Sequence, residues 1–215
     1  MESHIHSTLS QINQFHDACG IGFIAESRGN PSRRVLELSF KALQNMQHRG
    51  AIGADEETGD GVGVLVDIPV PFFTGLVKDK FNVQLKPDEI LGIGMVFVPK
   101  HFQKTTEKEI KSACQKLKIN YIGQRKVPVN NSSLGPTALE TCPTILQYFF
   151  SLKPGKIKKV ESRLYLLRKR IENKLNNKHE KIHFCSLSSK TIVYKGLMRA
   201  NQLDRFYDDL NHSDL

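Results

Sequence analysis

Strand-length apolar segments alternate along this chain with segments whose apolar residues recur at helical spacing. This alternation predicts a mixed fold in which helices lie on sheets. No internal repeat, low-complexity tract or linker divides the 215 residues, so we expect one domain with a substantial core. We expect extended segments at residues 21–26, 62–67, 91–98, 121–129, 144–150, 183–187 and 191–194, and helices at 33–47, 72–81, 106–117, 160–176 and from Ala200.

Three expectations concern how these segments begin and pair. Residues 21–26 are expected to lie beside residues 62–67 in one sheet. Thr106, with Glu109 three residues later, matches a capping box and predicts the start of a helix. Residues 183–187 and 191–194 are close enough in sequence to pair as a hairpin.

The composition argues against a membrane or secreted protein. The longest apolar runs contain glycine and proline and fall short of the roughly 20 residues that span a bilayer. The first residues lack the basic and apolar regions of a signal peptide. The four cysteines, at positions 19, 114, 142 and 185, show no metal-ligand spacing, so we expect a reducing cytoplasm.

The net charge of +9 is concentrated between residues 153 and 199, which raises the alternative of a nucleic-acid surface. However, the apolar residues of the predicted helix 160–176 recur at helical spacing and leave its lysines on the opposite, solvated face. No recognition motif for nucleic acid accompanies the charge. Solvation is the favoured interpretation, with nucleic-acid binding kept as an unlikely alternative.

Cys19 stands between a polar leader and the first apolar segment, in the stretch QFHDACGIGFIAE. If the leader is removed before Cys19, the new α-amine can act as the general base for the thiol of the same residue. The α-amine titrates near ~8 and a free thiol near ~8.5, so a modest local field suffices at neutral pH. Gly20 leaves room for a substrate carbonyl. Taken alone, a lone cysteine is more often a small buried apolar residue.

Several motifs occur in order along the chain: DACGIGFIA, HRGA, TGDGVGVL, LGIGMVFVP, LGPTALETCPTILQYFF, RLYLLRKRIEN and FCSLSSKTIVYKGLMRANQLDRFYDDL. Together they closely resemble the class II (N-terminal nucleophile) glutamine amidotransferase domain of the glutamate synthase large subunit. The resemblance covers nearly everything after the leader.

The resemblance implies an α+β fold, a four-layer αββα sandwich of the N-terminal-nucleophile hydrolase kind, of which about the first half is present. It implies that residues 1–18 are a propeptide, that residues 19–215 are a partial amidotransferase domain, and that Cys19 is the catalytic nucleophile. Glutamine would be the substrate, and the synthase domains would be partners. The complete enzyme would need FMN and an iron–sulfur cluster, with no cofactor and no metal held by this segment.

The resemblance also gives His48, Arg49 and Gly50 a supporting role in the glutamine pocket. The alternative is a solvated turn at a helix end, where the two basic side chains complement the helix dipole. TGDGVG is interpreted as a tight turn, with Asp60 bonding backbone donors, because it precedes a strand and not a helix.

Two family segments that lie just beyond the matching region do not occur in this sequence: Arg-x-Ser-Thr-Asn, for the glutamine α-carboxylate, and His-Asn-Gly-Glu, for the oxyanion hole. Losing one oxyanion donor costs on the order of 10²- to 10³-fold in rate. The expectation is therefore a truncated or split chain, inactive alone, with open sheet edges. A non-catalytic assembly module of the same fold is the alternative function.

Overall fold

The computed structural model describes residues 20–29, 32–153, 157–176 and 181–213. The predicted leader, residues 1–18, and Cys19 lie outside these residues. The helices are α2 (Arg33–Asn45), α3 (Val70–Phe81), α4 (Gln103–Leu117), α5 (Pro136–Thr141), α6 (Ile157–Leu175) and α7 (Leu203–Phe206). The strands are β1 (Val62–Asp67), β2 (Ile90–Val98), β3 (Asn120–Lys126), β4 (Thr144–Leu152), β5 (His183–Ser188) and β6 (Thr191–Gly196). Short 3-10 turns include η1 (Gln47–Arg49), η4 (Ala200–Gln202) and η5 (Asp208–Asn211).

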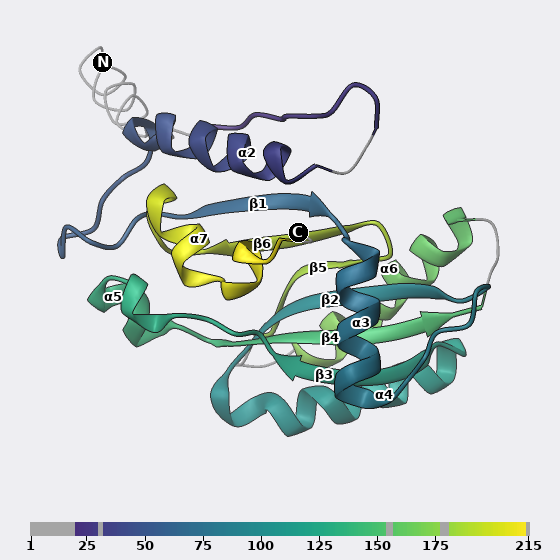
Figure 1. Cartoon of the computed structure of the whole chain (residues 1–215). Helices are drawn as coiled ribbons and strands as arrows, with labels where there is room; N and C mark the ends of the chain where they lie inside the picture. Colours follow the sequence, from purple (N-terminus) through teal and green to yellow (C-terminus); the bar gives the residue numbers. More distant parts are fainter. Residues whose placement is uncertain (1–19, 30–31, 154–156, 177–180, 214–215) are drawn as a thin grey trace, which may run out of the picture.

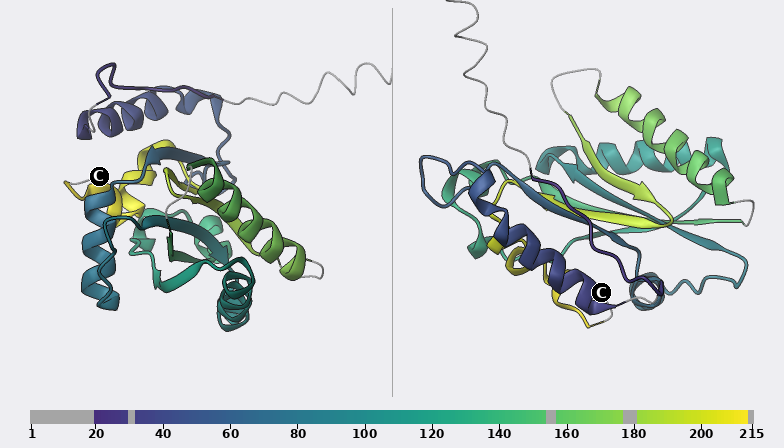
Figure 2. Two further views of the ribbon diagram at one scale, coloured as in Figure 1. Left: turned by 90° about the vertical axis from the view of Figure 1, so that its right-hand side faces the viewer. Right: turned by 90° about the horizontal axis from the view of Figure 1, so that it is seen from above.

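The strands form two antiparallel sheets. One has four strands in the order β3-β4-β2-β5, and the other consists of β1 and β6. Figures 1 and 2 show α2 on the outer side of the β1–β6 sheet, and α4 and α6 beyond the four-stranded sheet. The α+β class predicted from the sequence is confirmed.

Two apolar clusters hold these elements together. The first joins α2, α3 and α7 to both sheets, and the second joins α4 and α6 to the outer face of the four-stranded sheet. Strand β4 contributes to both, because alternate side chains of a strand point to opposite faces. Phe149 belongs to the first cluster, whereas Tyr148 and Phe150 belong to the second. All nine residues of β4 are buried, as expected for a central strand covered on both faces.

Helix α6 follows its sequence pattern. Its apolar residues Val160, Leu164, Leu167, Ile171 and Leu175 are all buried in the second cluster. The lysines and arginines between them lie on the remaining faces, and Lys159, Lys169, Arg170 and Lys174 are exposed. The apolar stripe and the exposed basic face that the sequence predicts for this helix are thus confirmed for the described residues.

The prediction of a strand at residues 21–26 is wrong. These residues have no regular secondary structure, and Ile21 and Phe23 are 92% and 94% exposed. The predicted pairing with residues 62–67 is wrong as well, since β1 pairs with β6. Alternating apolar residues indicate only that a segment has an apolar face. A strand also needs a neighbouring strand to pair its backbone hydrogen bonds.

The predicted capping box is also wrong. Helix α4 begins at Gln103, after a 3-10 turn, so Thr106 lies inside the helix. Its side chain is fully buried and its hydroxyl donates to the Phe102 carbonyl at 2.9 Å. A buried threonine that bonds back to residue i−4 satisfies its hydroxyl within the helix, and the sequence pattern does not distinguish this from a cap.

The predicted hairpin of residues 183–187 and 191–194 does not form. Both strands exist, but β5 joins the four-stranded sheet and β6 joins β1. The chain changes sheets at Ser189 and Lys190, and Glu161 of α6 holds this corner by accepting the Ser189 N–H at 2.7 Å and its hydroxyl at 2.6 Å. The Thr191 N–H, which a two-residue hairpin turn would pair with the Ser188 carbonyl, instead donates to the Ser188 hydroxyl at 3.3 Å.

Candidate functional site

The start of the described chain lies against the end of α2. A Cβ atom added to Gly20 would be 3.1 Å from Met46 Sδ and 3.6 Å from Arg49 Cδ. Position 20 is therefore tight, and the absence of a side chain lets the backbone approach this helix end closely. Cys19 is outside the described residues, but its neighbour Gly20 places the start of the domain beside Arg49.

The three residues of the HRG motif follow α2 directly. His48 and Arg49 are exposed in the turn η1, and the His48 ring nitrogen Nδ1 lies 3.0 Å from the Asn45 carbonyl oxygen. That contact satisfies a carbonyl at the helix end, as the helix-dipole alternative expects. Arg49 Cδ would lie 3.6 Å from a Cβ atom added to Gly20, so Arg49 lies near the start of the described chain. The pocket role of His48, Arg49 and Gly50 stays a prediction.

Gly50 opens a loop of residues 50–61 that returns to β1, and we call it the 50–61 loop. Its two ends are held side by side. The Asp60 N–H donates to the Ala51 carbonyl at 3.2 Å, and Ile52 forms a bridge with Gly59. A Cβ atom on Gly50 would lie 3.0 Å from Asp60 Oδ1. The Asp60 carboxylate therefore sits next to the HRG motif.

The carboxylate that organises the tip of this loop is Asp55. It accepts the backbone N–H groups of Glu57 and Thr58, the Thr58 hydroxyl and the N–H of Thr137, which belongs to α5. The hydrogen bonds from Thr58 and Thr137 stabilise the charged form and hold the pKa of Asp55 well below its usual range. The sequence predicts that Asp60 bonds the backbone donors of this loop, whereas Asp55 accepts these hydrogen bonds. An aspartate that precedes a threonine by three residues in a glycine-rich loop is the signal that was available.

A second segment, residues 198–202, closes the other side of the 50–61 loop. Arg199 Nη1 donates to the Glu56 carbonyl at 3.4 Å, and Gln202 Nε2 donates to the Glu57 carbonyl at 3.3 Å. Gly59 has no room for a side chain, because a Cβ there would lie 2.6 Å from the Met198 carbonyl oxygen. Segments far apart in sequence thus meet at the loop that follows the HRG motif.

The described cysteines do not suit nucleophilic catalysis. Burial raises the pKa values of the Cys114 and Cys185 thiols to about 12 and also raises that of Cys142. A thiol held in its protonated form is a poor nucleophile at neutral pH. Of the four cysteines, Cys19 therefore remains the candidate nucleophile.

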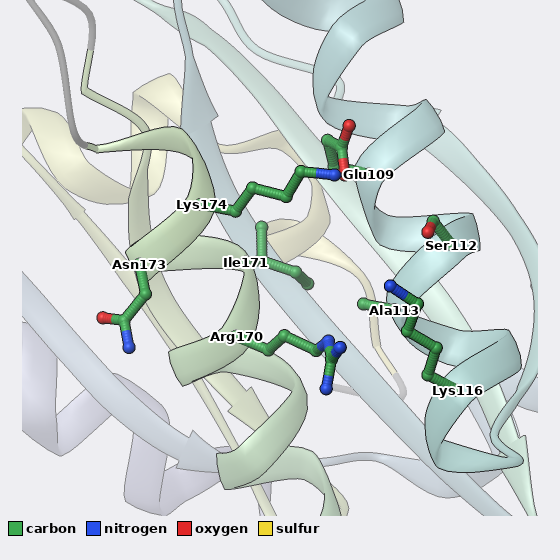
Figure 3. A pocket seen from close by; sticks show the side chains of 8 residues that line it. All are labelled: Glu109, Ser112, Ala113, Lys116, Arg170, Ile171, Asn173 and Lys174. Atoms are coloured by element: carbon green, nitrogen blue, oxygen red, sulfur yellow. Dashed lines mark ion pairs between the residues drawn. The ribbon is translucent and has the colours of Figure 1, made fainter.

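The outer helical layer contains a cleft of about 380 Å³ between α4 and α6. Figure 3 shows Lys116 and Arg170 reaching into it from opposite helices, and Lys174 pointing toward Glu109. The Lys174 Nζ to Glu109 Oε2 distance is 2.5 Å. The cleft is lined by residues of α4 and α6 alone, whereas Gly20 and the HRG motif lie near the end of α2. We therefore treat it as separate from the candidate site.

The described residues contain neither a candidate metal site nor a helix that could span a membrane. Among the described residues, no group of three or more His, Cys, Asp or Glu side chains could hold a metal ion. Within the same part of the chain, none of the helices is long and apolar enough to cross a bilayer.

The candidate site thus consists of the segment that begins at Gly20, the HRG turn near it and a loop held by Asp55. Comparison with known proteins shows the family of the chain. Residues 19–215 match the family described as class-II glutamine amidotransferases, and the match begins at Cys19. The chain belongs to this family.

The relatives narrow the class further. The chain is 39% identical over 199 residues to the NADPH glutamate synthase large chain of Bacillus subtilis, covering 91% of this chain and 13% of that protein. It is 36% identical over 213 residues to the ferredoxin-dependent glutamate synthase of Pyropia yezoensis, covering 97% of this chain and 14% of that protein. A similar match, 38% over 213 residues, is found with ferredoxin-dependent glutamate synthase 1 of Arabidopsis thaliana. The chain thus resembles the glutamine amidotransferase part of glutamate synthases and spans about 13–14% of the length of the first two relatives.

Proposed function

We propose that this chain is the glutaminase part of a glutamate synthase and that Cys19, freed at its amino group, is the nucleophile. The observation that carries the proposal is the start of the family match at Cys19, directly before the glycine that packs against the HRG turn. The high pKa values of the described thiols support it, because burial disfavours their thiolates.

The chemistry follows from the two groups on one residue. The α-amine accepts the thiol proton, and the thiolate attacks the side-chain carbonyl carbon of glutamine. The C–N bond breaks, and the departing nitrogen takes a proton to leave as ammonia, which gives a γ-glutamyl thioester. Water then attacks the thioester, releases glutamate and returns the thiol. While residues 1–18 remain attached, the nitrogen of Cys19 is a non-basic amide, so cleavage of the leader is part of the proposal.

The finer fold assignment is also a proposal. The arrangement of a helix, a two-stranded sheet, a four-stranded sheet and two helices agrees with a four-layer αββα sandwich of the N-terminal-nucleophile kind. We propose that the remainder of the amidotransferase domain supplies the oxyanion hole and the grip on the glutamine α-carboxylate.

The synthase reaction itself would take place elsewhere in the complete protein. We propose that the ammonia reaches synthase domains that carry FMN and an iron–sulfur cluster and is used there with 2-oxoglutarate. The described residues of this chain do not fit such a cluster, since they contain no metal-ligand group and their thiols are held protonated by burial.

The test uses the complete gene product. Sequencing of its N-terminus should begin at Cys19, and Cys19→Ala should lower glutamine hydrolysis by at least about 10³-fold. Cys142→Ala is the matched control, because it removes the same atom from a thiol whose pKa is raised. Glutamine hydrolysis that survives Cys19→Ala, or an active enzyme that keeps residues 1–18, would overturn the proposal. The non-catalytic alternative expects no effect of Cys19→Ala on any property.

A further inference from the structure

The 50–61 loop connects two groups that lie beside the start of the domain. Arg49 directly precedes the loop, and its Cδ would lie 3.6 Å from a Cβ atom added to Gly20. Gly50 begins the loop, and Asp60, near its other end, has its carboxylate against Gly50. A shift of the loop would therefore move Arg49, which lies near Gly20. The contacts that fix the loop then matter for the chemistry proposed at Cys19, the residue before Gly20.

The loop is fixed at its tip by one carboxylate. Asp55 Oδ1 accepts from Thr58 N at 2.8 Å and from Glu57 N at 3.1 Å. Asp55 Oδ2 accepts from the Thr58 hydroxyl at 2.5 Å and from Thr137 N at 3.1 Å. The first pair closes the turn, and the bond to Thr137 ties the turn to a segment 82 residues away.

The chain on both sides of the tip comes too close for the loop to slide. A Cβ atom on Gly135 would lie 2.6 Å from Thr58 Oγ1 and 2.7 Å from Thr58 N. On the opposite side, Gly59 is equally close to the Met198 carbonyl. Thr58 is buried, and its hydroxyl also accepts the Ala138 N–H at 3.3 Å. The tip therefore has one arrangement in which all these groups are satisfied.

We infer that Asp55 is a positioning residue for the N-terminal cysteine: it holds the 50–61 loop so that Arg49 keeps its place near Gly20, the residue after Cys19, and Asp60 its place against Gly50. This inference rests on the proposed function of Cys19. Asp55 acts through the loop and need not touch the substrate.

A carboxylate suits this position better than an amide. Each of its two oxygens accepts two hydrogen bonds, and all four partners are donors. If the amide of Asp55→Asn places its oxygen at the Oδ1 position, the turn is kept. Its NH₂ group then faces the Thr137 N–H. In the reverse orientation, the NH₂ group would face the Glu57 and Thr58 N–H groups. Either orientation sets donors against donors.

The experiment compares two pairs of variants in the complete gene product. Asp55→Asn is matched by Glu57→Gln, which removes a charge from an exposed side chain of the same loop. Thr58→Val, which removes the hydroxyl at nearly constant shape, is matched by Thr58→Ser, which keeps it. We expect Asp55→Asn and Thr58→Val to lower kcat for glutamine hydrolysis by roughly 10- to 100-fold, since small misplacements of reacting groups have effects of this size. KM should change by less than about threefold, and the two controls should match the parent protein.

Hydrogen exchange gives a readout that does not depend on activity. The amides of Thr58 and Thr137 should lose protection in Asp55→Asn, while amides in β4 keep theirs. If the parent protein hydrolyses no glutamine, the proposed function fails, and the exchange data still test the anchoring of the loop. Parent-like kcat and protection in Asp55→Asn would overturn the inference, as would equal losses in Thr58→Val and Thr58→Ser. Melting temperatures identify a variant that fails to fold, in which case the Thr58 pair decides.

Discussion

The Arg125 guanidinium and the Asp209 carboxylate form an ion pair inside the protein, although 84 residues separate them. Their side chains are only 8% and 3% exposed. Arg125 Nε also donates to Gln147 Oε1 at 2.6 Å, and the Tyr194 hydroxyl donates to Asp209 Oδ2 at 3.2 Å. This network joins β3, β4 and β6 to η5, so it fastens the last described segment of the chain to both sheets.

Removing one partner of this pair should be strongly destabilising. Asp209→Asn leaves the buried guanidinium without its counter-charge, which typically costs about 3–5 kcal/mol. Urea unfolding measures this loss, and Asp208→Asn is the matched control, because Asp208 is exposed one residue earlier. The control should stay within about 0.5 kcal/mol of the parent. Equal effects of both substitutions would contradict the role assigned to the pair.

Two Gly→Ala substitutions should change the free energy of unfolding in opposite directions. Gly135→Ala places a Cβ 2.6 Å from Thr58 Oγ1 and should destabilise the protein by about 1–3 kcal/mol. Gly75 is exposed in α3 with nothing within 4 Å of an added Cβ, so Gly75→Ala should stabilise by up to about 1 kcal/mol. Thermal unfolding of both variants checks the two signs. A stabilising Gly135→Ala would mean that the loop tip is free to move.

Thiol labelling should separate Cys19 from the other cysteines. At pH 8 the Cys114 and Cys185 thiols, with pKa values of about 12, are almost wholly protonated in the folded protein. Iodoacetamide should therefore label them only after unfolding, whereas Cys19, as the proposed nucleophile, should react first. Peptide mass spectrometry of briefly labelled protein measures the order. Early labelling of Cys185 would contradict the burial of that thiol.

The anchoring of the 50–61 loop should tolerate mild acid. The pKa of Asp55 is lowered below its ordinary value of 3.8 by bonds from Thr58 and Thr137. A lowered folded-state pKa means that the stabilisation is fully present above the unfolded value and is lost only as the pH falls through the folded value. The protection of the Thr58 amide, corrected for intrinsic exchange, should be the same at pH 7 and pH 5. A decline over this interval would show that another group controls the loop.

The sequence predicted the positions of helices and strands better than the pairing of the strands. The apolar spacing in α6 and the largely apolar, aromatic-rich segment of β4 located both elements to within a few residues. The same kind of pattern failed for residues 21–26, and it did not show that β5 and β6 belong to different sheets. In the site, the sequence drew attention to the HRG motif but not to Asp55, whose partner Thr137 is distant in the chain.

The sequence by itself determined the periodic faces of the helices and strands and the order of motifs from Cys19 onward. Periodicity is set by local backbone geometry, so neighbouring residues carry that information. Only the tertiary structure decided that β1 pairs with β6, that Asp55 bonds Thr137 and that Arg125 meets Asp209. Such contacts join distant segments, and they form only where packing of the whole chain brings complementary groups within bonding distance.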